Sequence, residues 1–232
     1  PDLSEKGAPV EGQPQSLDRR LFMQLLVFGD CIDTNEVVEA MTAAKIKGVV
    51  YEDVNDPNGI AILTLSEDPD FFVSTLRPML KRDSFAALTL RDEFTMFGRT
   101  YTIGYETDLE DTLFGRPTRN VLNPETPWAV WYPLRRAGSF EQLDATEQRA
   151  ILGEHGMIGM SFGAGGYASD IRLACHGLDK NDNDFVIGLI GKELYPLSAL
   201  VQTMRKTKQT SLHLERLGPF FVGKVAWQSA ND

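Results

Sequence analysis

The sequence predicts an α+β protein built from two similar halves, and three observations support this fold class. Apolar stretches of strand length alternate with helical patterns in the same order twice along the 232 residues. When residues 71–100 are aligned with 196–225 without a gap, one methionine, one lysine, one arginine and one glycine are identical in the two segments. The apolar stretches 60–65 and 185–190 coincide at the same offset, so the halves share spacing as well as order.

The first half is expected at residues 18–105, after an arm at 1–17 that contains three prolines and few apolar residues and that would lie on a partner. Its first strand is an unbroken apolar run, and its first helix follows Thr34 with acids in the first turn. Asp56-Pro57-Asn58-Gly59 is a turn between strands. The expected elements are strand 21–28, helix 35–41, strands 48–51 and 60–65, helix 69–81 and strand 95–105.

The second half is expected at 128–232, after a proline-containing connector at 106–127. Its first helix begins with a capping box, Asp144 and Glu147, and is expected to end near Gly156. The expected elements are strand 128–133, helix 144–155, strands 171–175 and 185–190, helix 197–206 and strand 220–227. Each half therefore has the βαββαβ order of a ferredoxin-like fold. Two such halves can leave a pocket between a sheet and its helices.

The composition excludes several classes of function. The chain has 23 Lys+Arg and 33 Asp+Glu, and a net charge of −10 is unfavourable for binding nucleic acid. No apolar run is long enough to span a membrane. Two cysteines do not make a disulfide framework, and three histidines without a paired spacing argue against a zinc site. We therefore expect a cytoplasmic protein with no nucleic-acid partner and no membrane span.

His155 is the most informative of the three histidines. Ile151, His155 and Ile158 stand at i, i+4 and i+7, which places His155 on the apolar face if the helix continues. Two interpretations remain open. One is a core histidine bonded to a carbonyl, and the other is an axial ligand to a cofactor in the pocket.

Tyr132 and Arg205 are candidate residues of the same pocket. On a strand, Tyr132 shares a face with Val130, while Trp131 takes the opposite face. Tyr132 is either a packing residue with a solvated hydroxyl or a phenol whose ionised form is favoured by nearby arginines such as Arg136. Arg205 is either a solvated surface residue or a bidentate partner for a carboxylate.

Together these motifs resemble the chlorite dismutase superfamily, and within it the coproheme decarboxylases. The resemblance is strong over 128–227 and extends to 20–105 at the level of the fold. The motifs that carry it stand in family order: Trp131-Tyr132-Pro133, Glu154-His155-Gly156-Met157-Ile158-Gly159, Gly177-Leu178-Asp179, Met204-Arg205 and Gly218-Pro219-Phe220-Phe221-Val222-Gly223.

The resemblance implies a barrel-like α+β fold of two halves, commonly assembled as a homopentamer, with haem b or its four-carboxylate precursor coproheme in the second half. It implies that His155 ligates the iron. Tyr132 corresponds to the tyrosine that becomes a radical when hydrogen peroxide drives the loss of propionate carboxyls as carbon dioxide. Arg205 and Thr210 correspond to propionate-binding positions, and Arg119 to another on the connector.

The chain departs from the family pattern at three places. Arg136 stands where similar decarboxylases have a lysine, and an arginine does not donate a proton easily. Asp170 falls at the distal position, where chlorite dismutases have arginine and many decarboxylases have glutamine. A register shift of two residues would place Arg172 there instead. Ile190 corresponds to the acid that hydrogen-bonds the proximal histidine of chlorite dismutases.

Three functions are therefore weighed. The first is oxidative decarboxylation of coproheme to haem b with hydrogen peroxide. The second is a haem-binding peroxidase or chlorite-dismutase-like protein with an altered distal residue, in which Asp170 accepts a proton from peroxide. The third is a haem-free oligomeric member of the family, with the glycine-rich stretch 163–166 filling the pocket.

Overall fold

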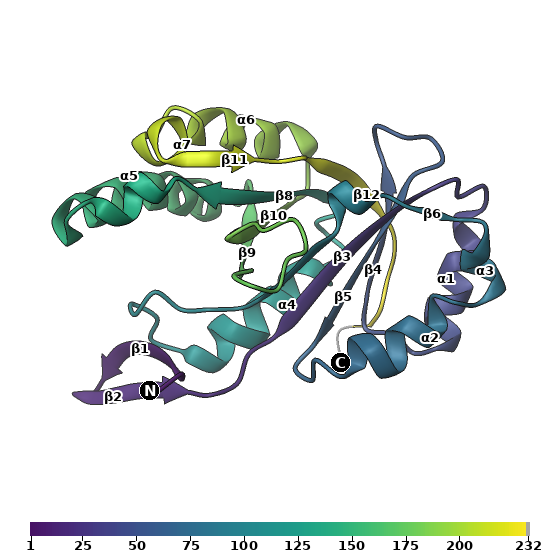
Figure 1. Cartoon of the computed structure of the whole chain (residues 1–232), viewed down its shortest axis with the longest axis horizontal. Coiled ribbons are helices and arrows are strands. Elements are labelled where there is room, and N and C mark those ends of the chain that lie inside the picture. The colour runs from purple at the N-terminus through teal and green to yellow at the C-terminus, as the bar shows by residue number, and fades with distance from the viewer. Residues whose placement is uncertain (231–232) are drawn as a thin grey trace.

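Eight antiparallel strands close into a barrel in the computed structural model, which describes residues 1–230 (Figure 1). Around the barrel the order is β10-β9-β7-β3-β5-β4-β12-β8, and β8 pairs with β10 to complete the ring. The strands are β3 (Phe22–Gly29), β4 (Gly48–Asp53), β5 (Ile60–Ser66), β7 (Met96–Arg99), β8 (Trp128–Arg136), β9 (Ser169–Ala174), β10 (Phe185–Gly191) and β12 (Phe221–Gln228).

Each half contributes four strands in the same spatial order. In the first half β7, β3, β5 and β4 lie side by side, and in the second half β12, β8, β10 and β9 do so. In both, the fourth strand of the half lies next to the first, then come the third and the second. This order confirms the expected ferredoxin-like halves. The halves meet along β4 and β12, which share five residue pairs, and along β7 and β9, which share the single pair Arg99–Ala174.

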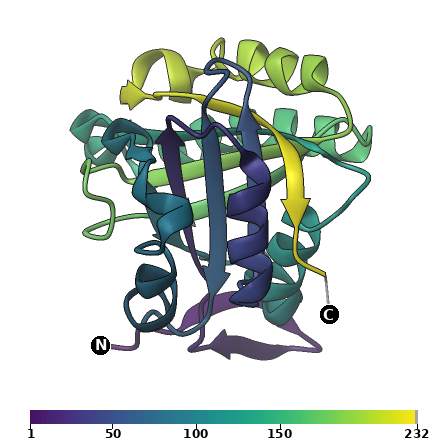
Figure 2. The same cartoon turned by 90° about the vertical axis from the view of Figure 1, so that its right-hand side faces the viewer.

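Helices cover the outside of the barrel, and short strands extend its edges. Figure 2 shows α1 packed against the strands of the first half. The helices are α1 (Thr34–Ala43), α2 (Arg77–Met79), α3 (Asp83–Ala86), α4 (Arg116–Val121), α5 (Ala145–Ala164), α6 (Leu194–Met204) and α7 (Lys208–Leu212). The remaining elements are strands β1 (Glu5–Val10), β2 (Gln13–Leu17), β6 (Thr89–Leu90) and β11 (Leu214–Leu217), with helical turns at Phe72–Leu76, Asp92–Phe94, Asp111–Gly115 and Gly138–Gln142.

Because side chains alternate between the two faces of a strand, each strand contributes to two apolar cores, one inside the barrel and one outside it. Met23 and Leu25 of β3 point into the barrel, where they join Trp131 and Phe221 from the second half. Leu26 points outward and packs with the helices of the first half. Because both faces of most strands are buried, the strand sequences are nearly continuous apolar runs rather than alternating ones.

The connector fills one end of the barrel. Leu109, Leu113 and Leu122 flank and line the helical turns around α4, and all three belong to the same apolar cluster as the barrel interior. The connector is thus part of the core and not a solvated linker.

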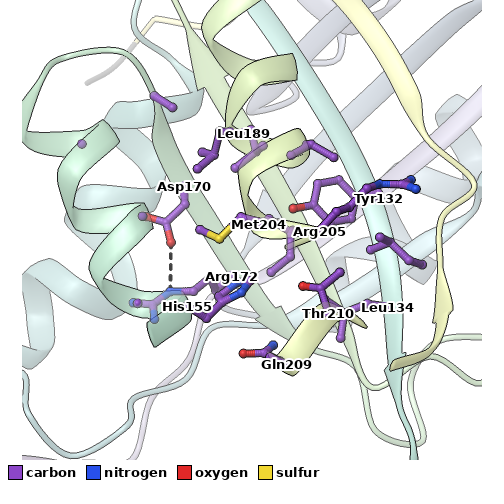
Figure 3. A pocket seen from close by; sticks show the side chains of 18 of the residues that line it. Tyr132, Leu134, His155, Asp170, Arg172, Leu189, Met204, Arg205, Gln209 and Thr210 are labelled. Carbon is purple, nitrogen blue, oxygen red and sulfur yellow. Dashed lines mark ion pairs between the residues drawn. The ribbon is translucent and has the colours of Figure 1, made fainter. Parts of the chain in front are cut away.

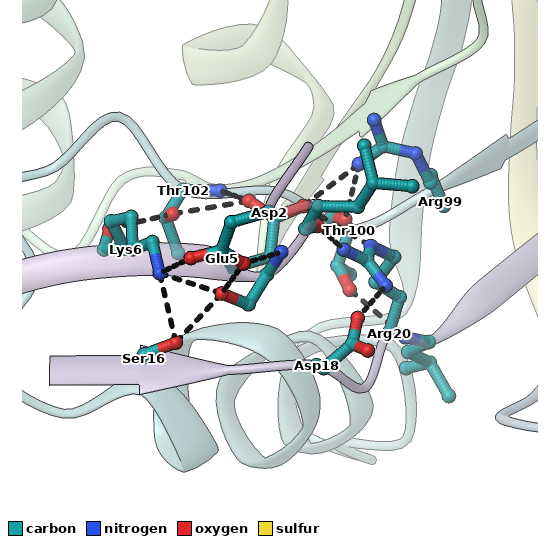
Figure 4. A network of polar contacts seen from close by, with 12 residues as sticks. Asp2, Glu5, Lys6, Ser16, Asp18, Arg20, Arg99, Thr100 and Thr102 are labelled. Carbon is teal, nitrogen blue, oxygen red and sulfur yellow. Dashed lines mark hydrogen bonds and ion pairs between the residues drawn. The ribbon is translucent and has the colours of Figure 1, made fainter.

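The N-terminal arm is a hairpin, β1 paired with β2, and it lies on its own chain. Figure 4 shows the polar network that anchors it. The Glu5 carboxylate accepts hydrogen bonds from Arg99 Nη1 at 2.9 Å and from the backbone N–H of Thr102 at 2.9 Å, and it also pairs with Arg20. The backbone N–H of Ala8 donates to the carbonyl of Glu106 at 2.8 Å. The sequence predicted a strand up to residue 105, but β7 ends at Arg99 because the residues that follow bind the arm.

The expectation that the helix after Asp144 ends near Gly156 is wrong. Asp144 caps α5 as expected, accepting from the N–H groups of Thr146 and Glu147, but α5 continues to Ala164. Glycine ends a helix by taking a positive φ, and the glycine with that conformation is Gly166, at +69°. Residues 160–164 therefore belong to α5, and the loop before β9 is confined to 165–168.

Candidate functional site

A cavity of about 400 Å³ lies between the outer face of the second half's sheet and helices α5, α6 and α7 (Figure 3). The sheet contributes Tyr132 from β8 and Asp170 and Arg172 from β9. Helix α5 contributes His155, and the segment from the end of α6 into α7 contributes Met204, Arg205, Gln209 and Thr210. Apolar side chains make up much of the remaining wall: Leu134, Ile187, Leu189, Leu200, Val201 and Leu217. Most of the residues expected at the site thus face one cavity.

His155 faces the cavity from the middle of α5. Its Nδ1 lies 3.3 Å from Thr207 Oγ1, a hydroxyl that is almost completely buried. Burial lowers the pKa of His155 below its ordinary value, and the positive charge of Arg136 lowers it further. The imidazole is therefore neutral near pH 7, which is the form in which histidine ligates a metal.

The part of α5 beside His155 that lines the cavity is rich in glycine. Gly156, Gly159 and Gly163 repeat along the side of α5 that lines the cavity. A Cβ added at Gly156 would meet no atom within 4 Å, and one at Gly159 would meet only Met204 Cε, at 3.6 Å. This part of the cavity can therefore accept a flat ligand pressed against the helix.

Tyr132 shares the outer face of β8 with Val130, while Trp131 points into the barrel, which confirms the expected alternation. The Tyr132 ring stacks on Phe220 at a centroid distance of 4.7 Å. Burial raises the pKa of Tyr132 well above its ordinary value, the charge of Asp170 raises it further, and Arg205 opposes this. Arg205 thus favours the ionised phenol, as an adjacent cation should, but desolvation outweighs this effect and the phenol stays protonated.

Asp170 and Arg172 are both on the cavity side of β9. Arg172 Nε lies 3.2 Å from Asp170 Oδ2, and Figure 3 marks this ion pair. The two residues are opposite Leu189 and Ile187 of β10, which also line the cavity. Both candidates for the distal position are therefore present at the site, held by one another.

Two of the expected arginines lie elsewhere. Arg119 pairs with Asp111 at 2.5 Å and does not line the cavity. Arg116, three residues earlier on α4, lines it instead. Arg136 packs between the rings of Phe140 and Phe185, with its guanidinium carbon 4.8 Å from each centroid. The positive charge of Arg136 lowers the pKa of His155 although Arg136 does not line the cavity.

Several other residues were missed by the sequence analysis. Arg116 stands in the same Arg-Pro-Thr-Arg segment as Arg119, so the sequence marked the segment but not the residue. Gln209 carries no signal of its own, because it is an ordinary helix residue. Ile190, assigned to the place of an acid next to the histidine, belongs to the apolar cluster of the barrel interior and so faces away from His155.

The described residues hold neither a cluster of metal-binding side chains nor a membrane-spanning helix. Residues 1–230 contain no cluster of three or more His, Cys, Asp or Glu side chains that could hold a metal ion. None of the helices in that range is both long and apolar enough to cross a membrane. Among the candidate site residues, His155 is the one whose side chain can serve as a single nitrogen ligand to a metal.

The chain resembles known proteins in sequence and in fold. Residues 60–226, more than half of the chain, match the family model for chlorite dismutase. No curated protein matches the sequence. A heme-binding protein from Thermus thermophilus is similar in structure, with a TM-score of 0.69 and 18% identity over 90% of this chain and 92% of that one.

Chlorite dismutase from Candidatus Nitrospira defluvii is similar in two structures, of a mutant and of a complex. A mutant form gives a TM-score of 0.68 at 16% identity, covering 91% of this chain and 93% of that one. The complex with imidazole gives 0.66 at 16% identity, covering 89% and 91%. At these identities the structures support the fold, and the family model supports the family. This chain belongs to the chlorite dismutase family.

Proposed function

We propose that this protein binds an iron porphyrin in the cavity beside α5, with His155 as the iron ligand, and that it decarboxylates coproheme to haem b with hydrogen peroxide. One observation carries the proposal: a neutral imidazole and a protonated phenol, His155 and Tyr132, face the same cavity. The heme-binding neighbour and the family support the choice of cofactor.

The residues present fit a porphyrin. The cavity has a volume of about 400 Å³, within the usual range for a bound small molecule. Its apolar sheet side and its glycine side offer two walls for a flat ring. Arg116, Arg172 and Arg205 line the cavity and suit carboxylate groups, since a guanidinium can donate two parallel hydrogen bonds to a carboxylate.

Loss of each propionate carboxyl is an oxidation. One propionate, one proton and one hydrogen peroxide give a vinyl group, carbon dioxide and two waters, so atoms, charge and electrons balance. The iron porphyrin, when bound, supplies the oxidising power. Tyr132 is held as a phenol by burial and can give up an electron and a proton together. Arg205 and Thr210 position the carboxylate side of the ligand.

A second candidate function rests on Asp170. Its carboxylate lines the cavity and is held in place by Arg172. Such a carboxylate can accept a proton from peroxide, as a general base in a peroxidase does. The third candidate loses its support, because the glycine-rich stretch ends α5 and leaves the cavity open. With the family we also propose a homo-oligomer, a pentamer.

The test is a titration of the purified protein with ferric coproheme, followed in the Soret region, and then addition of hydrogen peroxide with mass spectrometry of the porphyrin. We expect a saturable shift of the Soret band and stepwise loss of carboxyl mass. Binding with peroxide consumption but no loss of mass would favour the peroxidase. Absence of binding would reject both functions.

A further inference from the structure

We propose that Thr207 is a positioning residue for His155: its hydroxyl accepts the Nδ1–H of the imidazole and leaves Nε2 unprotonated for a ligand in the cavity. The tautomer follows from the hydrogen bonds of this chain alone. Its consequence for iron rests on the proposed function. The pairing is specific to this chain's own residues, since the expected acid position, Ile190, faces the barrel interior.

The hydrogen-bond inventory of Thr207 assigns the tautomer. A hydroxyl has one proton to donate and two lone pairs that accept. Thr207 Oγ1 lies 2.8 Å from the carbonyl oxygen of Met204, which can only accept and is much nearer than Thr210 Oγ1 at 3.4 Å, so the hydroxyl proton is used at Met204. Nδ1 of His155, 3.3 Å from the same oxygen, must then be the donor. The neutral ring therefore carries its proton on Nδ1, and Nε2 keeps its lone pair.

The hydroxyl is fixed by its place in the fold. Thr207 is the N-cap of α7 and accepts from the backbone N–H of Thr210 at 3.4 Å. The next residue, Lys208, donates its backbone N–H to Glu154 Oε2 at 3.0 Å. Two neighbouring residues of α5, Glu154 and His155, are thus bound to two neighbouring residues at the start of α7. Thr207 is only 2% exposed, so water does not compete for the hydrogen bonds of its hydroxyl.

This arrangement links the imidazole to the carboxylate side of the cavity. Helix α7 also carries Gln209 and Thr210, which line the cavity. A ligand held by α7 therefore sits on the same helix whose cap orients His155. A hydroxyl is a neutral acceptor, so it orients the ring without giving it the added basicity that a carboxylate partner would.

The first experiment reads the tautomer directly in the protein without added porphyrin. At about pH 8 histidines are neutral, and nitrogen–proton NMR of their side chains distinguishes the two tautomers. With three histidines in the chain, His155→Gln assigns the signal. We expect Nδ1–H in the wild type, a shift toward Nε2–H in Thr207→Val, and recovery of Nδ1–H in Thr207→Ser. Nε2–H in the wild type, or an unchanged tautomer in Thr207→Val, would overturn the proposal.

The matched control is Thr203→Val. Thr203 Oγ1 donates to the carbonyl of Ala199 at 2.8 Å on α6. The Thr203→Val variant therefore loses the same kind of hydrogen bond as Thr207→Val, but at a position that does not contact His155. We expect the His155 tautomer to be unchanged in this variant. Circular dichroism and thermal unfolding check that both threonine variants fold. If Thr203→Val shifts the tautomer as much as Thr207→Val, the effect is not specific to Thr207 and the proposal fails.

The second experiment uses ferric haem. Removing a partner that orients a metal ligand typically costs about 10–100-fold in affinity, and we expect this loss in Thr207→Val but not in Thr203→Val. The iron–imidazole stretching frequency of the reduced complex should also shift in Thr207→Val. Affinity and frequency equal to wild type, with the tautomer changed, would contradict the positioning role. If the wild type binds no haem, the proposed function fails while the tautomer result stands.

Discussion

Neighbouring side chains on β8 serve different cores. Trp131 is fully buried in the barrel, and Tyr132 lines the cavity on the other face. Tyr132 makes no hydrogen bond to another of the described residues; its contacts are the stacked ring of Phe220 and the apolar wall. Its environment therefore keeps the phenol neutral without fixing its hydroxyl proton to a neighbour. This is the state that the proposed chemistry needs.

The first prediction concerns Tyr132→Phe. Because the hydroxyl has no partner among the described residues, the free energy of unfolding should change by no more than about 0.5 kcal/mol. Coproheme should bind with unchanged affinity, but addition of hydrogen peroxide should release no carbon dioxide. Mass spectrometry of the porphyrin measures the loss of carboxyl mass. Tyr195→Phe, at an exposed tyrosine on α6, is the control and should decarboxylate normally. Normal turnover by Tyr132→Phe would contradict the assigned role.

The sequence was informative about single residues wherever a strand set the periodicity. It predicted the faces of Val130, Trp131 and Tyr132 because alternation along a strand is local. It did not predict that Arg116 and not Arg119 reaches the cavity. Which side of the short helix α4 faces inward depends on how Leu113 and Val121 pack into the barrel, and this is a long-range contact.

At the scale of elements, α5 is unusual in carrying four glycines inside a helix of 20 residues. Each glycine in a helix interior costs about 1 kcal/mol relative to alanine. Three of the four line the cavity. The helix thus carries the stability cost of glycine at positions where a side chain would occupy the cavity. This explains why the sequence predicted the wrong helix end. Glycine is also the usual residue at a helix terminus, and only contacts with the rest of the fold distinguish the two uses.

The second prediction compares Gly156→Leu with Gly153→Leu. An added Cβ meets no atom within 4 Å at either position, so neither variant should lose stability, and each should gain up to about 1 kcal/mol from helix propensity. Gly156 lines the cavity and Gly153 does not. Gly156→Leu should therefore weaken haem binding by about tenfold or more, measured by Soret titration. Equal affinities for the two variants would show that the ligand does not lie against this wall.

At the scale of the whole molecule, the two seams between the halves are unequal. β4 and β12 share five residue pairs, whereas β7 and β9 share one. Gly98 is next to the weak seam, and a Cβ there would lie 2.6 Å from Cys175 Sγ and 2.9 Å from Leu173 Cβ. The absence of a side chain at Gly98 thus lets the second seam close.

The third prediction follows from this contact. Gly98→Ala should lower the free energy of unfolding by about 1–3 kcal/mol, the usual cost of overpacking a core. Urea denaturation followed by tryptophan fluorescence measures it. Gly138→Ala is the control, because a Cβ there meets no atom within 4 Å. Equal midpoints for the two variants would mean that the seam tolerates a side chain and does not limit closure.

The repeat in the sequence predicted two halves with the right element order, because the halves share the order and spacing of their elements although few of their residues are identical. The repeat alone did not predict that the halves share one barrel, which only the resemblance to the family implied. Nor did it predict that the arm binds its own chain, with Glu5 on Arg99 and Thr102 and Ala8 on Glu106. Both features depend on contacts between segments far apart in the sequence. The proposed boundaries at 17, 105 and 127 remain sequence-based predictions.

The central claim is that His155 ligates the iron of a bound porphyrin. The most direct measurement is a Soret titration with ferric haem of the wild type, His155→Ala and His176→Ala. His176 is an exposed histidine paired with Asp184, so its loss controls for removing an imidazole elsewhere. We predict a saturable Soret shift in the wild type and in His176→Ala, and loss of that shift in His155→Ala. An unchanged Soret spectrum and affinity in His155→Ala would contradict the account.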